Sequence, residues 1–236
     1  MSKYSPYSFS KIDSYSSCPR KFKYSYVEKI KVDKEQAHLL KGKYIHNILE
    51  LYRNPDIDSI KPESLDIPLE SKEVYKELTA SFIGSQTGQE YINGDCVGRE
   101  IKLSFNSKLE MCDYWDEQCL FRGSIDRLNK INDETLLAID WKTGKYDPRR
   151  LTKNQLKYYA LWCFMQYPEI KHVKCHYVYI ETCDVTEYVY SKESMKEIMK
   201  ELLLRIKIIE KARMFVKNRT ALCNYCDFFK HGHCTG

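Results

Sequence analysis

Apolar residues recur at intervals of three and four along the first part of the chain, which is the period of an amphipathic helix. Residues 34–53 carry this pattern at Ala37, Leu40, Tyr44, Ile48 and Leu51. Asn54 and Pro55 are expected to end the helix. A second helix is predicted over residues 71–83, and the glycine-containing segment 84–94 separates it from a region with a different period.

Between residues 97 and 141 the pattern changes to short runs rich in Ile, Leu, Phe and Tyr, divided by polar turns. Such runs predict strands of an antiparallel meander, here at 99–105, 107–115, 118–131 and 135–143. Helical spacing returns at 154–166 and 191–216, and further strands are expected at 172–182 and 186–191. The order of elements predicts a mixed α/β domain.

Composition and charge narrow the class of protein. The chain has 236 residues, is 43% hydrophobic, and carries 38 Lys and Arg against 33 Asp and Glu, a net charge of +5. This length suits one globular domain. No stretch approaches the roughly 20 apolar residues of a membrane span. The N-terminal sequence lacks the apolar core of a secretory signal. We therefore expect a cytoplasmic protein without membrane contact. The charge permits a polyanionic partner but does not require one.

Two carboxylates and a lysine stand near the ends of neighbouring predicted strands. Asp126 follows Gly-Ser-Ile, and Asp140 precedes Lys142 by two positions. Alternate side chains of a strand share one face, so Asp140 and Lys142 should project into the same pocket. Carboxylates hold hard divalent cations such as Mg²⁺ or Mn²⁺, and the lysine would either orient or deprotonate water or neutralise charge on a phosphate. A lone Asp-x-Lys tripeptide is more often a surface ion pair.

Four short motifs occur together in a fixed order: Gly42-x-x-x-His46, Gly123-x-Ile-Asp126, Asp140-x-Lys142-Thr-Gly and Gln155-x-x-x-Tyr159. In this order they resemble the RecB-like branch of the PD-(D/E)XK nuclease superfamily. That branch contains the RecB and AddB nuclease domains and the iron-sulfur exonuclease of CRISPR adaptation. The resemblance implies a restriction-endonuclease-like core, a mixed central sheet flanked by helices.

The resemblance also implies roles for individual residues. His46, Asp126 and Asp140 would be ligands of the catalytic Mg²⁺ or Mn²⁺, the Trp141 carbonyl would add another, and Lys142 would be the catalytic lysine. An imidazole ligand favours Mn²⁺ over Mg²⁺, which prefers an all-oxygen shell. Without the other motifs, His46 would read as an ordinary hydrogen-bonded histidine of an amphipathic helix.

Three further residues are candidates for DNA contact. Gln155 and Tyr159 are four positions apart and share one helix face, and the resemblance places them beside the substrate backbone. Arg127 is close in sequence to the proposed pocket and is a candidate phosphate contact. The alternatives are a core aromatic for Tyr159 and a solvated cation for Arg127.

Ten cysteines without an export signal favour metal ligation and buried thiols over a disulfide framework. Cys223, Cys226 and Cys234 form a ligand-like group near the C-terminus, and Cys18, His231 and His233 are the candidates for a fourth ligand.

The resemblance selects Cys18, which begins a Cys-Pro-x-x-Phe segment, and implies a [4Fe-4S] cluster. Seven residues separate Cys226 from Cys234 where the family usually has about five, so zinc stays an alternative. Residues 1–33 and 217–236 would form a structural clasp around the cluster, and 34–216 the nuclease core of a single domain.

These patterns together predict a metal-dependent nuclease, and the resemblance implies that it is an exonuclease acting on single-stranded DNA or DNA ends. No P-loop motif is present, so a helicase motor would be another chain. Helicase, recombination or CRISPR adaptation proteins are the expected partners. The alternatives are a DNA-binding adaptor of the same fold with little cleavage, and a zinc-clasped structural module.

Overall fold

A computed structural model describes residues 3–32, 37–52, 65–147 and 153–235. The chain divides into two compact units. We call Glu35–Leu103 with Ser124–Met195 the sheet unit. Met1–Lys34, Ser104–Gly123 and Lys196–Gly236 together form the cysteine unit, because they contain Cys18 and the C-terminal cysteines. The predicted clasp, 1–33 and 217–236, lies within this larger assembly of three segments.

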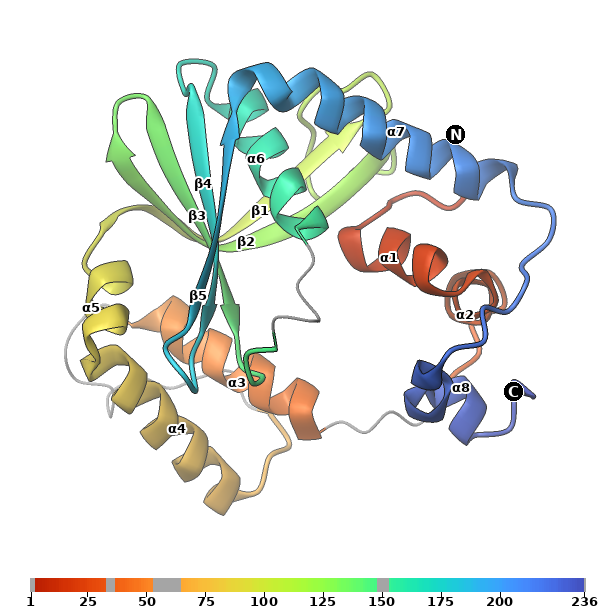
Figure 1. Cartoon of the computed structure of the whole chain (residues 1–236), viewed down its shortest axis with the longest axis horizontal. Coiled ribbons are helices and arrows are strands. Elements are labelled where there is room, and N and C mark those ends of the chain that lie inside the picture. Colours follow the sequence, from red (N-terminus) through yellow and green to blue (C-terminus); the bar gives the residue numbers. More distant parts are fainter. Residues whose placement is uncertain (1–2, 33–36, 53–64, 148–152, 236) are drawn as a thin grey trace. The chain divides into compact units, whose positions relative to one another are not determined.

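A five-stranded sheet with the order β1-β2-β3-β4-β5 organises the fold (Figure 1). Its strands are β1 (Asp95–Asn106), β2 (Cys119–Asn132), β3 (Thr135–Lys142), β4 (His172–Tyr179) and β5 (Val185–Ser191). β2 pairs antiparallel with β3, β3 pairs parallel with β4, and β4 pairs antiparallel with β5. A parallel pair needs a crossover between its strands, and helix α6 (Asn154–Gln166) lies in the β3–β4 connection.

Helices cover both faces of the sheet within the sheet unit. Helices α3 (Ala37–Leu51), α4 (Leu69–Gly84) and α5 (Gln86–Ile92) supply apolar side chains to one core with β3. In that core Trp141 of β3 lies edge-on to Phe82 of α4, with ring centroids 5.7 Å apart. The neighbouring residue Asp140 faces the opposite side, towards α6. The alternation along β3 therefore sends the aromatic ring into the core and the carboxylate to α6.

The elements predicted from apolar periodicity are confirmed for α3, α4, α6, β4 and β5, with boundaries shifted by a few residues. The predicted ends of the first helix, at 34 and 53–55, lie outside the described residues. The strand predicted over 107–115 is wrong, because this segment forms turns and only Met111 makes an isolated bridge, with Phe105. The long C-terminal helix, α7 (Met195–Lys211), ends earlier than residue 216.

Helix α5 lies in the glycine-containing segment where no element was predicted. Its N-cap is Ser85, whose hydroxyl accepts a hydrogen bond from the Gly88 amide at 3.0 Å. Gly88 is buried, and a Cβ there would lie 1.9 Å from the Phe82 carbonyl oxygen. The glycine is therefore required by the close approach of α5 to the end of α4.

We expect Gly88→Ala to lower the free energy of unfolding by about 2–3 kcal/mol, because the new methyl group would overpack against backbone that cannot move aside. Gly84→Ala is the matched control, since a Cβ at Gly84 meets nothing within 4 Å and alanine favours a helix. Urea titration followed by circular dichroism measures both changes. Equal stability of the two variants would contradict the packing argument.

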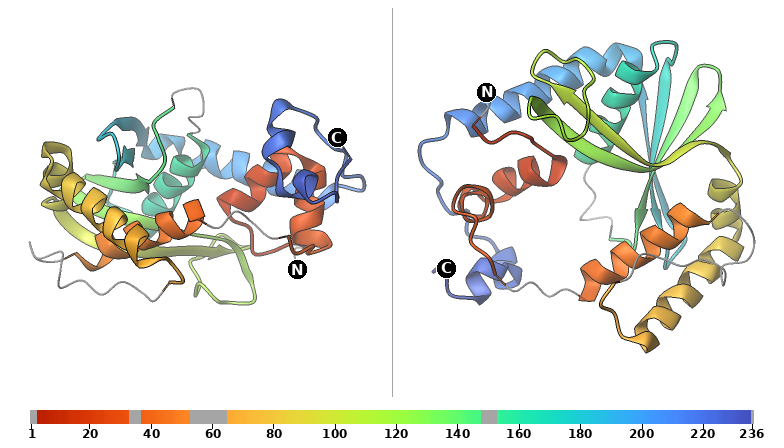
Figure 2. Two further views of the ribbon diagram at one scale, coloured as in Figure 1. Left: turned by 90° about the horizontal axis from the view of Figure 1, so that it is seen from below. Right: turned by 180° about the vertical axis from the view of Figure 1, so that it is seen from behind.

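The cysteine unit joins segments from both ends of the chain. It contains α1 (Phe9–Ser17), α2 (Pro19–Phe22), a π-helical turn (Lys23–Val27), most of α7, a 3₁₀ turn (Ala221–Tyr225) and α8 (Asp227–Lys230). Both views in Figure 2 show α1 and α2 beside the C-terminal segment. Tyr7 links these segments, because its hydroxyl donates to Glu210 at 2.6 Å and its backbone pairs with Phe121. None of the described helices is long and apolar enough to cross a membrane.

Candidate functional site

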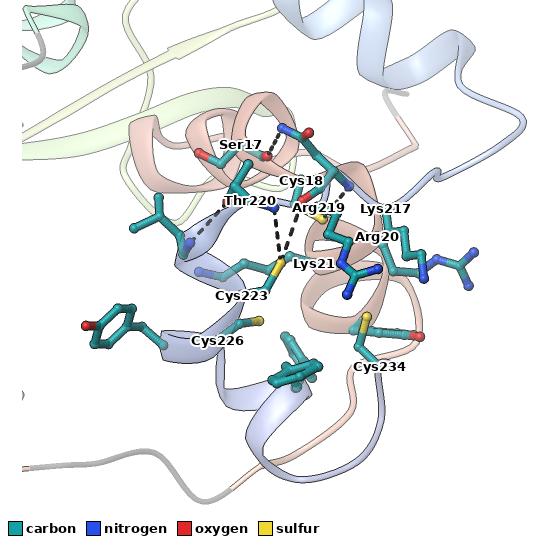
Figure 3. Close-up of a pocket in the computed structure, with 16 residues that line it drawn as sticks. Ser17, Cys18, Arg20, Lys21, Lys217, Arg219, Thr220, Cys223, Cys226 and Cys234 are labelled. Carbon is teal, nitrogen blue, oxygen red and sulfur yellow. Dashed lines mark hydrogen bonds between the residues drawn. The ribbon is translucent and has the colours of Figure 1, made fainter. Parts of the chain in front are cut away.

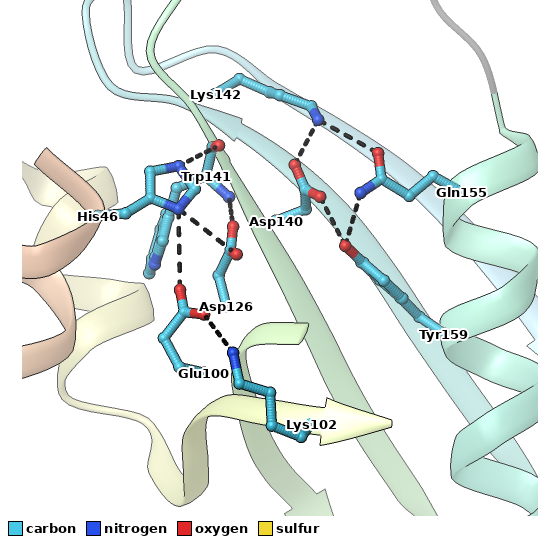
Figure 4. Close-up of polar contacts among 9 residues, drawn as sticks. All are labelled: His46, Glu100, Lys102, Asp126, Asp140, Trp141, Lys142, Gln155 and Tyr159. Atoms are coloured by element: carbon cyan, nitrogen blue, oxygen red, sulfur yellow. Dashed lines mark hydrogen bonds and ion pairs between the residues drawn. The ribbon is translucent and has the colours of Figure 1, made fainter. Parts of the chain in front are cut away.

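Five elements of the sheet unit converge on one group of polar side chains (Figure 4). Helix α3 supplies His46, β1 supplies Glu100, β2 supplies Asp126, and β3 supplies Asp140 and Lys142. Helix α6 adds Gln155 and Tyr159. The structure thus brings together residues from all four sequence motifs, together with a glutamate that the sequence analysis did not identify.

His46 and Asp126 are held by direct contacts. Nδ1 of His46 lies 3.5 Å from Asp126 Oδ1, and its Nε2 donates to the Trp141 carbonyl at 3.0 Å. The other oxygen of Asp126 accepts from the Trp141 amide at 2.7 Å. The β3 backbone at Trp141 therefore fixes the orientation of the imidazole and of the carboxylate, and it presents its carbonyl next to both.

Glu100 is the residue that sequence analysis missed. Its Oε1 lies 3.9 Å from His46 Nδ1, and ligand atoms of His46, Glu100 and Asp126 all lie within 4.8 Å of one another. Its φ of 46° is in the left-handed region, which a glutamate in a strand rarely adopts. The only sequence signal was an acidic residue inside a predicted strand that also carries Arg99 and Lys102. That signal is too common to identify a site.

One imidazole and two carboxylates can hold a divalent cation. They lie in a cavity of about 570 Å³ that Lys43, Lys102 and Asn47 also line. The cavity is open enough for an ion together with part of a larger ligand, and the two lysines would attract an anionic one.

A second group surrounds Asp140. Its Oδ2 lies 2.6 Å from Lys142 Nζ, and its Oδ1 accepts from the Tyr159 hydroxyl at 2.9 Å. Gln155 donates to the Tyr159 oxygen at 2.7 Å and accepts from Lys142 at 3.4 Å. Asp140 and Lys142 thus share one face of β3 as the alternation predicts, and Gln155 and Tyr159 position them. In this arrangement Tyr159 is buried, and it contacts the candidate site through Asp140.

The charged groups of the site shift one another's pKa values. Burial lowers the pKa of His46, but the charges of Asp126, Glu100 and Asp140 outweigh that effect and raise it to about 10. Burial raises the pKa of Asp126, and the neighbouring Asp140 charge adds to the rise. The pKa of Lys142 is raised because Asp140 outweighs the effect of burial. Lys142 is therefore an ammonium ion at neutral pH.

Arg127 does not suit the phosphate contact predicted for it. Only 3% of the residue is exposed, and its guanidinium donates to Asn129 at 2.8 Å and to the Ile92 carbonyl at 2.7 Å. Asn129 in turn donates to the Tyr91 carbonyl at 2.9 Å. Arg127 thus ties the C-terminal end of α5 to β2, and the sequence could not reveal this because α5 itself was not predicted.

The four predicted cysteines line one cavity of about 300 Å³ in the cysteine unit (Figure 3). Cys18 and Cys226 are the N-cap residues of α2 and α8, and Pro19 occupies the first position of α2. Neither of the alternative ligands, His231 and His233, is among the described residues that line this cavity. The cysteine sulfurs do not form a group of three within 4.8 Å in the described part of the chain.

The chain is similar to known proteins in sequence and in fold. Residues 6–230 match the family model described as the PD-(D/E)XK nuclease superfamily. A crystal structure from Eubacterium rectale, described as a "Putative exonuclease", is similar with a TM-score of 0.55 and 12% identity over 97% of this chain and 88% of that one. The structure of SSO0001 has a TM-score of 0.32 and 15% identity over 83% and 95% of the two chains. Curated protein sequences give no match.

Proposed function

Because the chain belongs to the PD-(D/E)XK nuclease superfamily, we propose that it is a Mg²⁺- or Mn²⁺-dependent deoxyribonuclease of the RecB-like branch. It would act as an exonuclease on single-stranded DNA or DNA ends. The supporting observation is that His46, Glu100 and Asp126 gather in one cavity while Asp140 and Lys142 lie on the adjoining strand.

His46, Glu100, Asp126 and Asp140 would hold the divalent cation, with the Trp141 carbonyl as a further donor. The bound cation supplies Lewis-acid chemistry, polarising the scissile phosphate and lowering the pKa of the attacking water. The two carboxylate oxygens of Asp140 already contact Lys142 and Tyr159, so Asp140 would bind the cation through a remaining lone pair. The donors are an imidazole and carboxylates, a set that Mn²⁺ accepts more readily than Mg²⁺.

The raised pKa of Lys142 supports one of the two roles considered for it. A protonated lysine has no lone pair with which to accept a proton from water as a general base. It would instead donate hydrogen bonds to the oxygens of the phosphate on which negative charge develops. Gln155 and Tyr159 hold Asp140 and Lys142 in place for this task.

The direct test is incubation of the protein with end-labelled single-stranded DNA in Mn²⁺, in Mg²⁺ and in EDTA. We expect progressive shortening from an end with either cation, faster with Mn²⁺, and none in EDTA. Internal cleavage of circular single-stranded DNA would contradict the exonuclease assignment. If the protein binds DNA but leaves it intact with both cations, the result would contradict the nuclease function and support the adaptor function.

Metal affinity should rise with pH, because a metal ligand must be a neutral imidazole and His46 is protonated below its raised pKa of about 10. Each unit by which the pH falls below that value should weaken Mn²⁺ binding by about tenfold. Isothermal titration in buffers of different ionisation enthalpy should show about one proton released per ion at pH 7. His46→Gln should bind more weakly and release little or no proton, and an affinity independent of pH in the wild type would contradict His46 as a ligand.

Glu100→Gln should weaken Mn²⁺ binding by about 10–100-fold while the fold is retained, since the change removes one charge and keeps the side-chain size. The matched control is Glu110→Gln, an exposed glutamate of the β1–β2 connection. Titration calorimetry measures both variants. An unchanged affinity in Glu100→Gln would remove Glu100 from the ligand set.

We further propose that Cys18, Cys223, Cys226 and Cys234 hold a [4Fe-4S] cluster. Four thiolates are the usual ligands of such a cluster, and these four cysteines line one cavity. Broad absorption near about 400 nm in anaerobically purified protein would support iron-sulfur thiolates, whereas a colourless protein with one bound zinc would contradict them.

A further inference from the structure

Positive charge is concentrated in the cysteine unit. Its three segments contain 19 Lys and Arg against 11 Asp and Glu, whereas the sheet unit contains 19 against 22. The modest net charge of +5 for the whole chain conceals this difference. An excess of positive charge confined to one part of a protein is expected of a surface that binds a polyanion.

The excess lies around two adjoining cavities of the cysteine unit. One is the cavity of the four cysteines, and the other has a volume of about 670 Å³. Six cationic side chains line them: Arg20, Lys21, Lys23, Arg213, Lys217 and Arg219. We call these residues the basic groove. No Asp or Glu is among the described residues that line either cavity.

The cations of the basic groove differ in how far carboxylates of the protein neutralise them. Lys23 pairs with Glu28 at 2.8 Å, but within the described residues no carboxylate forms an ion pair with Arg213 or Arg219. Both of these arginines are exposed. Several like charges held together without carboxylates repel one another, and a ligand with regularly spaced negative charges relieves that repulsion.

Apolar side chains are exposed among these cations. Tyr225 is 76% exposed and lines the cysteine cavity, and Met214 is 77% exposed and lines the other. An exposed aromatic ring beside cations suits single-stranded nucleic acid, whose unpaired bases stack while its phosphates meet the charges. An acidic polypeptide would match the charges but has no base to stack on Tyr225.

We propose that the basic groove is a second contact for single-stranded DNA, in which the six cations bind backbone phosphates and Tyr225 stacks on a base. This inference rests on the proposed nuclease function for its choice of DNA, but the binding it describes requires neither the metal ions of the sheet unit nor cleavage. The cysteine unit would then bind substrate as well as join the ends of the chain.

The test is the affinity of full-length protein for a fluorescent, mixed-sequence single-stranded oligonucleotide, measured by anisotropy at several salt concentrations. All proteins carry Lys142→Ala so that the DNA stays intact. Adding Arg213→Ala and Lys217→Ala should weaken binding about tenfold and should reduce the slope of log K against log salt by about 1.4, or about 0.7 for each lost phosphate contact. The matched control adds Lys108→Ala and Lys200→Ala, two exposed lysines of the same unit outside the groove, and should change neither quantity.

A further variant tests the stacking contact. Tyr225→Ala should weaken binding of the single strand by about fivefold or more and leave binding of a duplex of the same length unchanged. Visible absorption of each variant checks that the cysteine cavity still holds its group. Unchanged affinity and salt slope in the groove variant would overturn the proposal, as would equally tight binding of polyglutamate, which would assign the groove to an acidic protein. Normal DNA binding by a protein that cuts no DNA would instead count against the nuclease function alone.

Discussion

Lys142→Ala should lower the rate of DNA cleavage by about 10²–10³-fold while leaving DNA binding within a factor of about two. The ammonium group of Lys142 is held 2.6 Å from Asp140 and stays protonated at neutral pH. Removing one such preorganised charge from a site where negative charge develops usually costs that much in rate. Single-turnover cleavage of labelled DNA in saturating Mn²⁺ measures the effect.

The control for this variant is Lys130→Ala, which removes the same charge from the other end of the β2–β3 pair. Lys130 pairs with the exposed Asp133 at 2.6 Å, and an exposed ion pair contributes little, so cleavage should be unchanged. Lys142→Arg should recover only part of the rate, because a planar guanidinium cannot replace a compact ammonium between Asp140 and Gln155. Full activity of Lys142→Ala would exclude the role proposed for this lysine.

Cys18→Ser should lower the free energy of unfolding by about 5 kcal/mol and abolish visible absorption. Cys18 and Cys223 are 205 positions apart in the sequence, so a shared metal group would close nearly the whole chain into one loop. Cross-linking a loop of that length removes about 5 kcal/mol of unfolded-state entropy, and metal binding itself adds folding free energy. Denaturant unfolding of anaerobically purified protein, followed by far-UV circular dichroism, measures the loss.

Cys96→Ser provides the comparison, since Cys96 is a half-buried residue of β1 outside the cysteine cavity. Its stability and absorption should stay close to those of the wild type. If Cys18→Ser behaves like Cys96→Ser and keeps its absorption, the fourth ligand is not Cys18 and the clasp does not join the two ends of the chain.

Local patterns predicted the elements whose apolar residues face one core. The period of three and four gave α3 and α6, and the alternation around Asp140 and Lys142 placed both on one face of β3. Prediction failed where the determining contact is distant in sequence. Segment 107–115 contains strand-forming residues but lies in turns, and α5 depends on the contact of Gly88 with Phe82.

The same distinction applies to single residues of the site. His46, Asp126, Asp140 and Lys142 stand in short motifs that can be read from the chain. Glu100 has no such motif, and only the pairing of β1 into the sheet brings it to His46. Arg127 carries a charge that suggests a phosphate contact, yet its position beneath the carbonyls of α5 makes it a buried structural residue.

The sequence by itself determined the class of chemistry, because carboxylates, an imidazole, a lysine and grouped cysteines are specified by residue type and spacing. The tertiary structure decided which of these groups meet, which stay buried, and where the positive charge accumulates. The basic groove is assembled from two segments separated by about 190 residues. A linear sequence shows charges in order along the chain, whereas a ligand responds to their arrangement in space, and folding alone sets that arrangement.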